Sequence, residues 1–156
     1  MKAYLRHVEG HTFVAKSDSN HWVPIDTGTA SGGTGAANDP FQLFVIGFSG
    51  CALVDVADIV KKSRKEAARL EMFVEVTRAE TAPKVVRSVE FHLQAEGDPT
   101  LGETLRRALE LSLTKYCSAS LSLDRAITFR GRVTVNGEAS DAWDVERKTG
   151  EYYTIP

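Results

Sequence analysis

Hydrophobic residues recur at helical spacing over residues 40–62, and this stretch predicts the central helix of the fold. Asp39 can cap the first free N–H groups, and Pro40 suits the first helical position because it has no N–H to satisfy. Apolar side chains fall on two faces of this helix, which predicts burial on all sides except in the last turns, from Asp55 onward. Glycine, serine and aspartate interrupt the apolar run, so we expect it to be too short to span a bilayer.

Alternating apolar and polar residues predict strands on both sides of this helix. Residues 2–16 predict a hairpin with a tight glycine turn, and residues 21–26 predict a short third strand. Residues 70–76 and 85–95 predict a long antiparallel hairpin with one face exposed to water, on which His92 falls.

Helical spacing returns in the second half of the chain. Residues 101–112 predict a second helix, and residues 115–118 interrupt its period. A short third helix is predicted over 119–126, and a final strand over 128–135. Because strands and helices are segregated rather than alternating singly, the order indicates an α+β fold with antiparallel sheets.

We expect a single domain over residues 1–156, since no linker or internal repeat interrupts the chain. The tail from 138 to 156 is expected to lie on the surface of the domain or of a partner chain. Residues 27–37 contain only Gly, Ser, Thr and Ala. Without a lysine or arginine they lack the signature of a phosphate-binding loop, so we expect a mobile connection to the long helix.

Composition narrows the possible functions. Lys and Arg number 19 and Asp and Glu number 21, giving a net charge of −2 and no electrostatic case for nucleic acid or an anionic membrane. No secretory leader is visible, so we expect a cytoplasmic protein. Two cysteines do not make a structural disulfide framework, which leaves redox or catalytic use in competition with inert burial.

Cys51 and Cys117 each lie in a short run of small residues. A reactive cysteine must be a thiolate, which requires positive potential and some access. Cys117 follows Lys115 at a predicted helix start, which favours an anion, whereas Cys51 lies about three turns into its helix and needs a cation from elsewhere. For both, an inert core thiol remains the alternative.

The sequence gives weaker support for a metal site or an acid/base pair. The cysteines with His7, His11 or His21 could supply zinc ligands, but the close Cys/His spacings of zinc sites are absent, and we expect no metal. Asp55 and Asp58 are interpreted as the point where the long helix reaches solvent, not as an acid/base pair.

Three short motifs resemble the OsmC/Ohr superfamily, and the order of elements is similar over residues 2–136. The motifs are the run from Asn38 to Phe44, then Gly50-Cys51, then Lys115-Tyr116-Cys117-Ser118. The resemblance implies an intertwined homodimer, with two long helices packed at its centre and sheets formed by both chains. It also implies a peroxidase that uses thiols, without a cofactor, to reduce organic hydroperoxides.

The resemblance assigns roles to particular residues. Cys51 would attack the peroxide and become a sulfenic acid, Cys117 would close a disulfide with it, and an external dithiol would reduce that disulfide. Phe41, Phe44 and Phe48 would line an apolar pocket for a hydrophobic peroxide.

Two departures from the Ohr-type pattern bear on this activity. Phe41 stands where those members have a glutamate that orients an arginine, and the arginine after the first hairpin turn is replaced by His11. Arg6, His11 or a residue of the other chain would then supply the cation for Cys51. The alternative function is an OsmC-like dimer that is not a peroxidase and that binds an apolar ligand or senses oxidants through Cys117.

Overall fold

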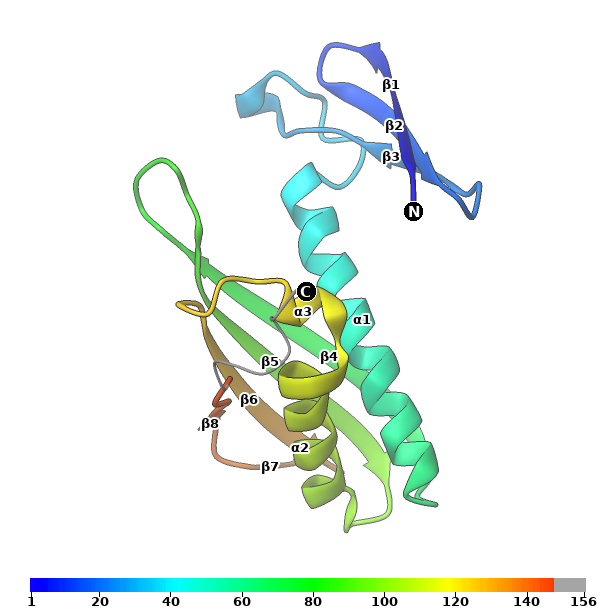
Figure 1. The fold of residues 1–156 in the computed structure, drawn as a ribbon, viewed down its shortest axis with the longest axis vertical. Coiled ribbons are helices and arrows are strands. Elements are labelled where there is room, and N and C mark those ends of the chain that lie inside the picture. Colours follow the sequence, from blue (N-terminus) through cyan, green and yellow to red (C-terminus); the bar gives the residue numbers. More distant parts are fainter. Residues whose placement is uncertain (148–156) are drawn as a thin grey trace, which may run out of the picture. The chain divides into compact units, whose positions relative to one another are not determined.

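The computed structural model describes residues 1–147, and its elements are shown in Figure 1. The chain forms two compact units, Met1–Ile46 and Gly47–Pro156. Helix α1 (Pro40–Lys62) runs across their boundary. The expectation of a single domain stays a prediction.

The first unit contains a three-stranded antiparallel sheet in the order β1-β2-β3. Its strands are β1 (Ala3–Glu9), β2 (Thr12–Ser17) and β3 (Trp22–Ile25). The predicted hairpin and the third strand are both confirmed.

The loop between β3 and α1 is organised around the buried carboxylate of Asp26, with the short helix η1 (Thr29–Ser31) inside it. Asp26 accepts hydrogen bonds from the hydroxyl of Thr34 and from the N–H groups of Thr27, Thr34 and Ala36. These bonds, that of the Thr34 hydroxyl first, hold the pKa of Asp26 far below its usual range. A lowered pKa stabilises the folded state at neutral pH, and this contribution is lost as the pH falls below about 4. The sequence predicted a mobile loop here and did not indicate that Asp26 organises it.

Helix α1 begins as predicted. The carboxylate of Asp39 accepts from the N–H of Gln42 at 2.8 Å, while the Gln42 side-chain oxygen accepts from the N–H of Asp39 at 2.9 Å. This reciprocal pair is a capping box, which satisfies two N–H groups at the start of the helix.

The second unit contains a five-stranded sheet in the order β4-β5-β6-β7, with β8 also paired to β6. Its strands are β4 (Ala67–Arg78), β5 (Val86–Gly97), β6 (Thr128–Val135), β7 (Glu138–Ala139) and β8 (Trp143–Asp144). The predicted antiparallel hairpin of β4 and β5 is confirmed. However, β5 and β6 pair in parallel, which corrects the expectation of purely antiparallel sheets. The helical segment between them supplies the long crossover that a parallel pair requires.

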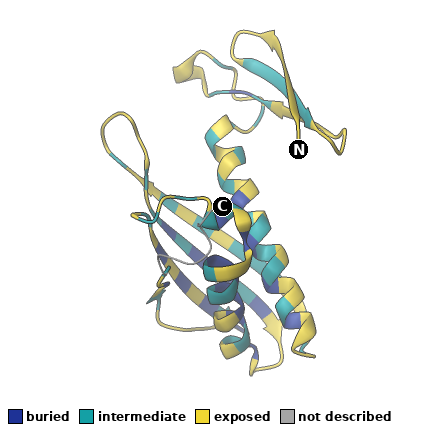
Figure 2. Cartoon of the chain, in the orientation of Figure 1, coloured by how far each residue is buried: buried dark blue, intermediate teal, exposed yellow. Residues whose placement is uncertain are grey.

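Helices α1 and α2 (Leu101–Leu111) cover the same face of this sheet (Figure 1). The inward residues of β5 are buried in alternation, as the striped strands in Figure 2 show. At the centre, the ring of Phe91 lies 6.2 Å from that of Phe48 on α1 and 5.4 Å from that of Phe129 on β6. The α+β class is therefore confirmed, with helices layered on one side of a sheet.

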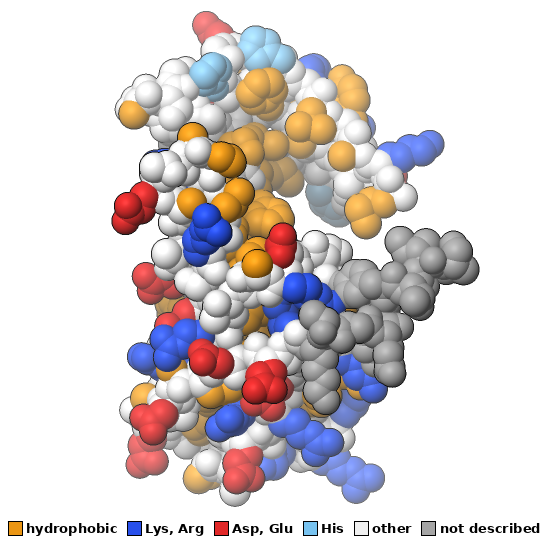
Figure 3. Space-filling model, turned by 60° about the vertical axis from the view of Figure 1, so that its left-hand side comes forward, with side chains coloured by type: hydrophobic (Ala, Val, Ile, Leu, Met, Phe, Trp, Pro, Cys, Tyr) orange, Lys and Arg blue, Asp and Glu red, His pale blue; other side chains and the backbone are white. Residues whose placement is uncertain are grey.

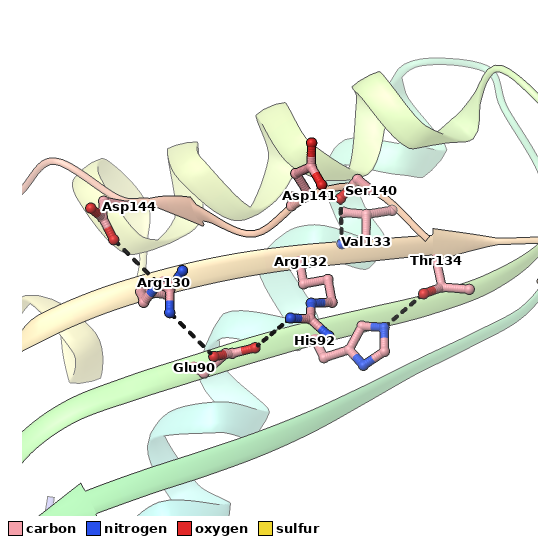
Figure 4. Close-up of polar contacts among 9 residues, drawn as sticks. All are labelled: Glu90, His92, Arg130, Arg132, Val133, Thr134, Ser140, Asp141 and Asp144. Atoms are coloured by element: carbon pink, nitrogen blue, oxygen red, sulfur yellow. Dashed lines mark hydrogen bonds and ion pairs between the residues drawn. The ribbon is translucent and has the colours of Figure 1, made fainter. Parts of the chain in front are cut away.

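The opposite face of the sheet carries a line of polar contacts (Figure 4). Glu90 lies between Arg130 at 4.0 Å and Arg132 at 3.7 Å, and the Nε2 atom of His92 is 2.8 Å from the hydroxyl of Thr134. Partial burial, and then Arg132, lower the pKa of His92. Exposed ion pairs of this kind contribute little to stability, so this is the solvated face that the alternation predicted.

Helix α1 is far less buried within one chain than the sequence predicted. Its buried residues follow one face at helical spacing: Phe48, Ala52, Val56 and Val60. In contrast, Phe44, Ile46 and Val54 are 43%, 55% and 64% exposed. Figure 2 shows exposed positions along the whole helix, and Figure 3 shows hydrophobic side chains on the surface. Within residues 1–147, one apolar face of α1 is therefore left largely exposed.

Helix α1 also has the length and hydropathy of a membrane-spanning helix, contrary to the expectation that it is too short. The core helix of a soluble protein can have the same properties. Length and composition alone therefore do not assign α1 to a bilayer.

The packing of the Asp26 loop makes a prediction for Gly33. A Cβ atom at this position would clash with the carbonyl oxygen of Thr27, whereas a Cβ at Gly28 would meet nothing within 4 Å. Gly33→Ala should lower the free energy of unfolding of the first unit by about 1–3 kcal/mol. Gly28→Ala should change it by less than about 0.5 kcal/mol. Urea denaturation followed by Trp22 fluorescence in a Trp143→Phe background measures both, and equal stabilities of the two variants would contradict the packing.

Candidate functional site

Cys51 lies in α1 and is half-buried, while Cys117 is fully buried and follows a π-helical turn, η2 (Ser112–Tyr116). This turn continues α2 directly, and its end explains the interrupted period in the sequence. Single π-helical turns inside or beside α-helices are frequent at functional sites. After Cys117 the helix α3 (Ser118–Leu121) has only one turn, shorter than predicted.

The structure brings the two cysteines together as free thiols, close enough for Cys51 to affect the pKa of Cys117. Burial raises the pKa of Cys117, and the neighbouring Cys51 raises it further, whereas the hydroxyl and N–H of Ser120 lower it. The net effect is upward. The expectation that a helix start makes Cys117 acidic is therefore wrong, because a one-turn helix offers little dipole and burial penalises the thiolate.

The sulfur of Cys117 is held from both sides. It donates a weak hydrogen bond to the carbonyl oxygen of Phe48 on α1 at 3.9 Å, and it accepts the N–H of Ser120 at 3.4 Å. Because Phe48 lies three residues before Cys51, the first contact ties Cys117 to the helical turn that carries the other cysteine.

Ser112 links the two cysteine-bearing segments. Its buried hydroxyl lies 2.9 Å from the carboxylate of Asp55 and 3.3 Å from the carbonyl oxygen of Ala52, both on α1. Its own carbonyl oxygen accepts the N–H of Cys117 at 2.9 Å. Asp55, one helical turn after Cys51, therefore binds Ser112 of η2, which corrects its interpretation as the point where α1 reaches solvent. Asp58 is exposed as expected.

Arg147 fixes the loop that follows Cys117. Its guanidinium stacks on the ring of Phe129 at 4.0 Å. It also donates to several main-chain carbonyl oxygens, those of Ser120, Leu123, Asp124 and Ile127. At Arg147 the described part of the tail packs on its own chain. Residues 148–156 lie outside the described range, so the expectation for the tail stays a prediction.

The remaining predicted site residues are distributed between the units. Phe48 is a core residue rather than an exposed wall. Phe41 and Phe44, with ring centres 5.7 Å apart, belong to the first unit. Arg6 and His11 also belong to the first unit, where Arg6 lies over the ring of Trp22. The expected roles of Phe41 and Phe44 in binding substrate, and of Arg6 or His11 in providing a cation for Cys51, stay predictions.

The cavities described in the second unit lie away from the cysteines. One of about 440 Å³ is lined by residues of α2 and β6, including Arg106 and Val133. Another of about 850 Å³ lies at the end of α1, beside Lys61 and Arg64. Within residues 1–147, no group of three His, Cys, Asp or Glu side chains could hold a metal ion. The chemistry available at the site is therefore that of two adjacent thiols.

The fold and the site define an α+β protein with a paired-thiol centre between a long helix and a π-helical turn. Residues 33–131 match the family of OsmC-like proteins, and this chain belongs to that family. It is 31% identical to protein YhfA of Escherichia coli K12, over 81% of this chain and 92% of YhfA.

Solved structures share the fold. An OsmC-like protein from Mycoplasma pneumoniae has a TM-score of 0.70 and 17% identity, over 86% of this chain and 95% of that one. The organic hydroperoxide resistance protein OsmC of Legionella pneumophila has a TM-score of 0.63 and 19% identity, over 86% of this chain and 98% of that one. The resemblance in the sequence motifs is thus confirmed at the level of family and fold.

The polar residues that support the cysteines were not predicted from the sequence: Ser112, Ser120 and Arg147. Serines at inward positions of a helical pattern were the available signal, since Ser112 ends the predicted apolar stripe. No local signal pointed to Arg147, because its partners lie 20 to 27 residues earlier in the chain.

The Ser112 linkage makes a stability prediction. Ser112→Ala should lower the free energy of unfolding by about 1–3 kcal/mol, because it removes the hydrogen bonds of a buried hydroxyl to the Asp55 carboxylate and the Ala52 carbonyl oxygen on α1. Ser122→Ala, which removes an exposed hydroxyl bonded only within its own turn, should change it by less than about 0.5 kcal/mol. Urea denaturation compares the two, and a Ser112 variant as stable as the wild type would exclude this linkage.

Proposed function

We propose that this protein reduces organic hydroperoxides through Cys51 and Cys117. The observation that carries the proposal is the pairing of two free thiols at one site of an OsmC-like fold. The Legionella protein of the same fold is an organic hydroperoxide resistance protein, which supports the choice of substrate class.

The exposure of the two thiols supports a division of roles. Cys51 is half-buried and can meet a substrate, whereas Cys117 is fully buried and can meet only a group already bound at the site. We therefore assign the attack on peroxide to Cys51 and the closure of the disulfide to Cys117.

The proposed cycle has three steps. The Cys51 thiolate attacks one peroxide oxygen, the O–O bond breaks, the alcohol leaves after taking a proton, and Cys51 becomes a sulfenic acid. The Cys117 thiolate then attacks the Cys51 sulfur, forming the disulfide and releasing hydroxide, which becomes water on protonation. Finally an external dithiol reduces the disulfide by two exchange steps and is itself oxidised.

The first step requires a cation near Cys51, because an unpaired thiolate is unfavourable in a partly buried site. We propose Arg6 or His11 of the first unit, from the same or from a second chain, for this charge. Removing the correct residue should slow peroxide attack without changing the second step.

We also propose a homodimer, with α1 of one chain packed on α1 of the other. The apolar face that the described part of the chain leaves exposed includes Ile46 and Val54. Gly47 and Gly50 are exposed on this helix, and a Cβ added at either would meet nothing within 4 Å in a single chain. Glycines allow two helix backbones to approach closely, and such a pairing would bury the apolar face in a soluble, cytoplasmic dimer.

One alternative was an oxidant sensor that uses Cys117 alone. Full burial and the raised pKa of Cys117 argue against it, because oxidants react with exposed thiolates. Binding of an apolar ligand by a non-peroxidase dimer is left as the competing function, and the activity assay separates the two.

The two cysteine variants should behave differently with cumene hydroperoxide. In the wild type, both thiols should be lost and an intramolecular disulfide should form. Cys51→Ser should lower the rate of peroxide consumption by at least about a hundredfold, while Cys117→Ser should retain a first turnover and accumulate a sulfenic acid at Cys51. Stopped-flow kinetics and mass spectrometry measure these species, and equal rates in the wild type and Cys51→Ser would exclude the proposed peroxidase.

The dimer can be tested at Val54. Val54→Asp places a charge on the uncovered face of α1 and should raise the dissociation constant of the dimer at least tenfold, about 1.4 kcal/mol. Phe73→Asp replaces a similarly exposed hydrophobic residue on β4 and should leave association unchanged. Sedimentation equilibrium provides the measurement. A monomeric wild type, or equal effects of the two variants, would contradict this interface.

A further inference from the structure

Ser120 carries a buried hydroxyl without a partner beside the candidate redox centre. It lies in α3, three residues after Cys117, and its side chain is fully buried. Among the described residues, its Oγ atom has no hydrogen-bond partner. Buried hydroxyl groups are almost always paired, so an unpaired one next to a reactive atom calls for a functional explanation.

The backbone of Ser120 is already oriented toward the cysteine. Its N–H donates to Cys117 Sγ at 3.4 Å, and its carbonyl oxygen accepts from Arg147 at 3.4 Å. Both main-chain polar groups of Ser120 are thus held by hydrogen bonds, and its side chain is left to rotate.

The sulfur of Cys117 needs a donor in only one of its two protonation states. As a thiol it is a weak acceptor, and it uses its own hydrogen toward the Phe48 carbonyl. As a thiolate it loses that contact and becomes a strong acceptor in a buried site. Deprotonation therefore leaves a strong acceptor in a buried site, and the free hydroxyl of Ser120 can donate a hydrogen bond to it.

We propose that the Ser120 hydroxyl rotates to donate a hydrogen bond to the Cys117 thiolate, and so promotes its attack on the Cys51 sulfur. The attack on a sulfenic acid rests on the proposed function. The hydrogen bond itself would assist any reaction in which Cys117 displaces a leaving group from Cys51.

Ser120 is assigned as the donor to the Cys117 thiolate because the charged and titratable neighbours of Cys117 are engaged elsewhere. On α1, Cys51 disfavours the Cys117 thiolate, and Asp55 is held by Ser112. Lys115 on η2 lies over the exposed ring of Tyr116, and Arg147 is bound to main-chain carbonyls. In addition, burial raises the pKa of Cys117, whereas the nearby Ser120 side chain lowers it, although the Ser120 hydroxyl makes no hydrogen bond to the resting thiol.

The test uses the aromatic disulfide DTNB in place of a peroxide. Thiolate attack by Cys51 breaks the reagent's S–S bond, forms a mixed disulfide and releases one coloured aryl thiolate. Attack by Cys117 on the Cys51 sulfur then forms the internal disulfide and releases a second aryl thiolate. The second phase reports the nucleophilicity of Cys117 alone, and a Cys117→Ser variant, which releases only one equivalent, identifies the first phase.

Ser120→Ala should leave the first phase unchanged and slow the second about fivefold at neutral pH. The fraction of thiolate falls when its donor is removed, and the greater intrinsic nucleophilicity of a less acidic thiol offsets only part of that loss. The pH profile of the second phase should move to higher pH. Ser118→Ala, which changes an exposed hydroxyl of the same turn, is the matched control and should change neither phase.

Thermal unfolding separates this role from a structural one. Because the hydroxyl has no partner in the resting state, Ser120→Ala should melt at the same temperature as the wild type or higher. A lower melting temperature, an unchanged second phase, or equal slowing of both phases would overturn the proposal. If DTNB gives the expected result but hydroperoxides do not react, the proposed peroxidase fails and the role of Ser120 stands.

Discussion

The contact between helix α1 and the π-helical turn η2 holds the two cysteines in place, and Ser112 is its centre. The serine is small enough to let the two backbones approach, and its hydroxyl and carbonyl groups bind α1 and Cys117 at once. A regular continuation of α2 would place the following residues at different angles around its axis. The wide turn and the buried serine together therefore set where Cys117 lies relative to α1.

Burial and reactivity oppose each other at this contact. The same packing that brings Cys117 to Cys51 removes water from its sulfur and raises its pKa. A fully buried thiol is protected from over-oxidation but reacts slowly unless local donors stabilise its anion. The turn that begins at Cys117 offers such donors from Ser120, and the loop behind it is clamped by Arg147. Rigidity of this loop is thus a requirement of the chemistry, because a donor helps only if it is already in place.

Periodicity in the sequence predicted nearly every strand and the first two helices, because a half-buried strand or helix leaves a local pattern. The family resemblance located the cysteines. Two failures depended on contacts distant in sequence: the parallel pairing of β5 and β6, and the carbonyl contacts of Arg147. The role of Asp26 was missed because its partners lie within ten residues in a loop that has no periodic pattern. The burial of α1 was overestimated for a different reason. An apolar face indicates that something covers it, but the pattern does not say whether the cover comes from the same chain.

That uncovered face bears directly on the chemistry of Cys51. Val54 and Gly47 lie three residues after and four residues before Cys51, so they are its neighbours on the helix surface, and both are exposed. Cys51 is therefore at the border between the packed core and the open apolar face. A second chain that covered this face would also remove water from Cys51 and bring its own side chains close to the sulfur. The sequence lacks the usual arginine and glutamate of Ohr-type members, so the electrostatic environment of the nucleophile would then depend on association. In the proposed dimer, assembly would therefore determine which charged groups lie near the Cys51 sulfur.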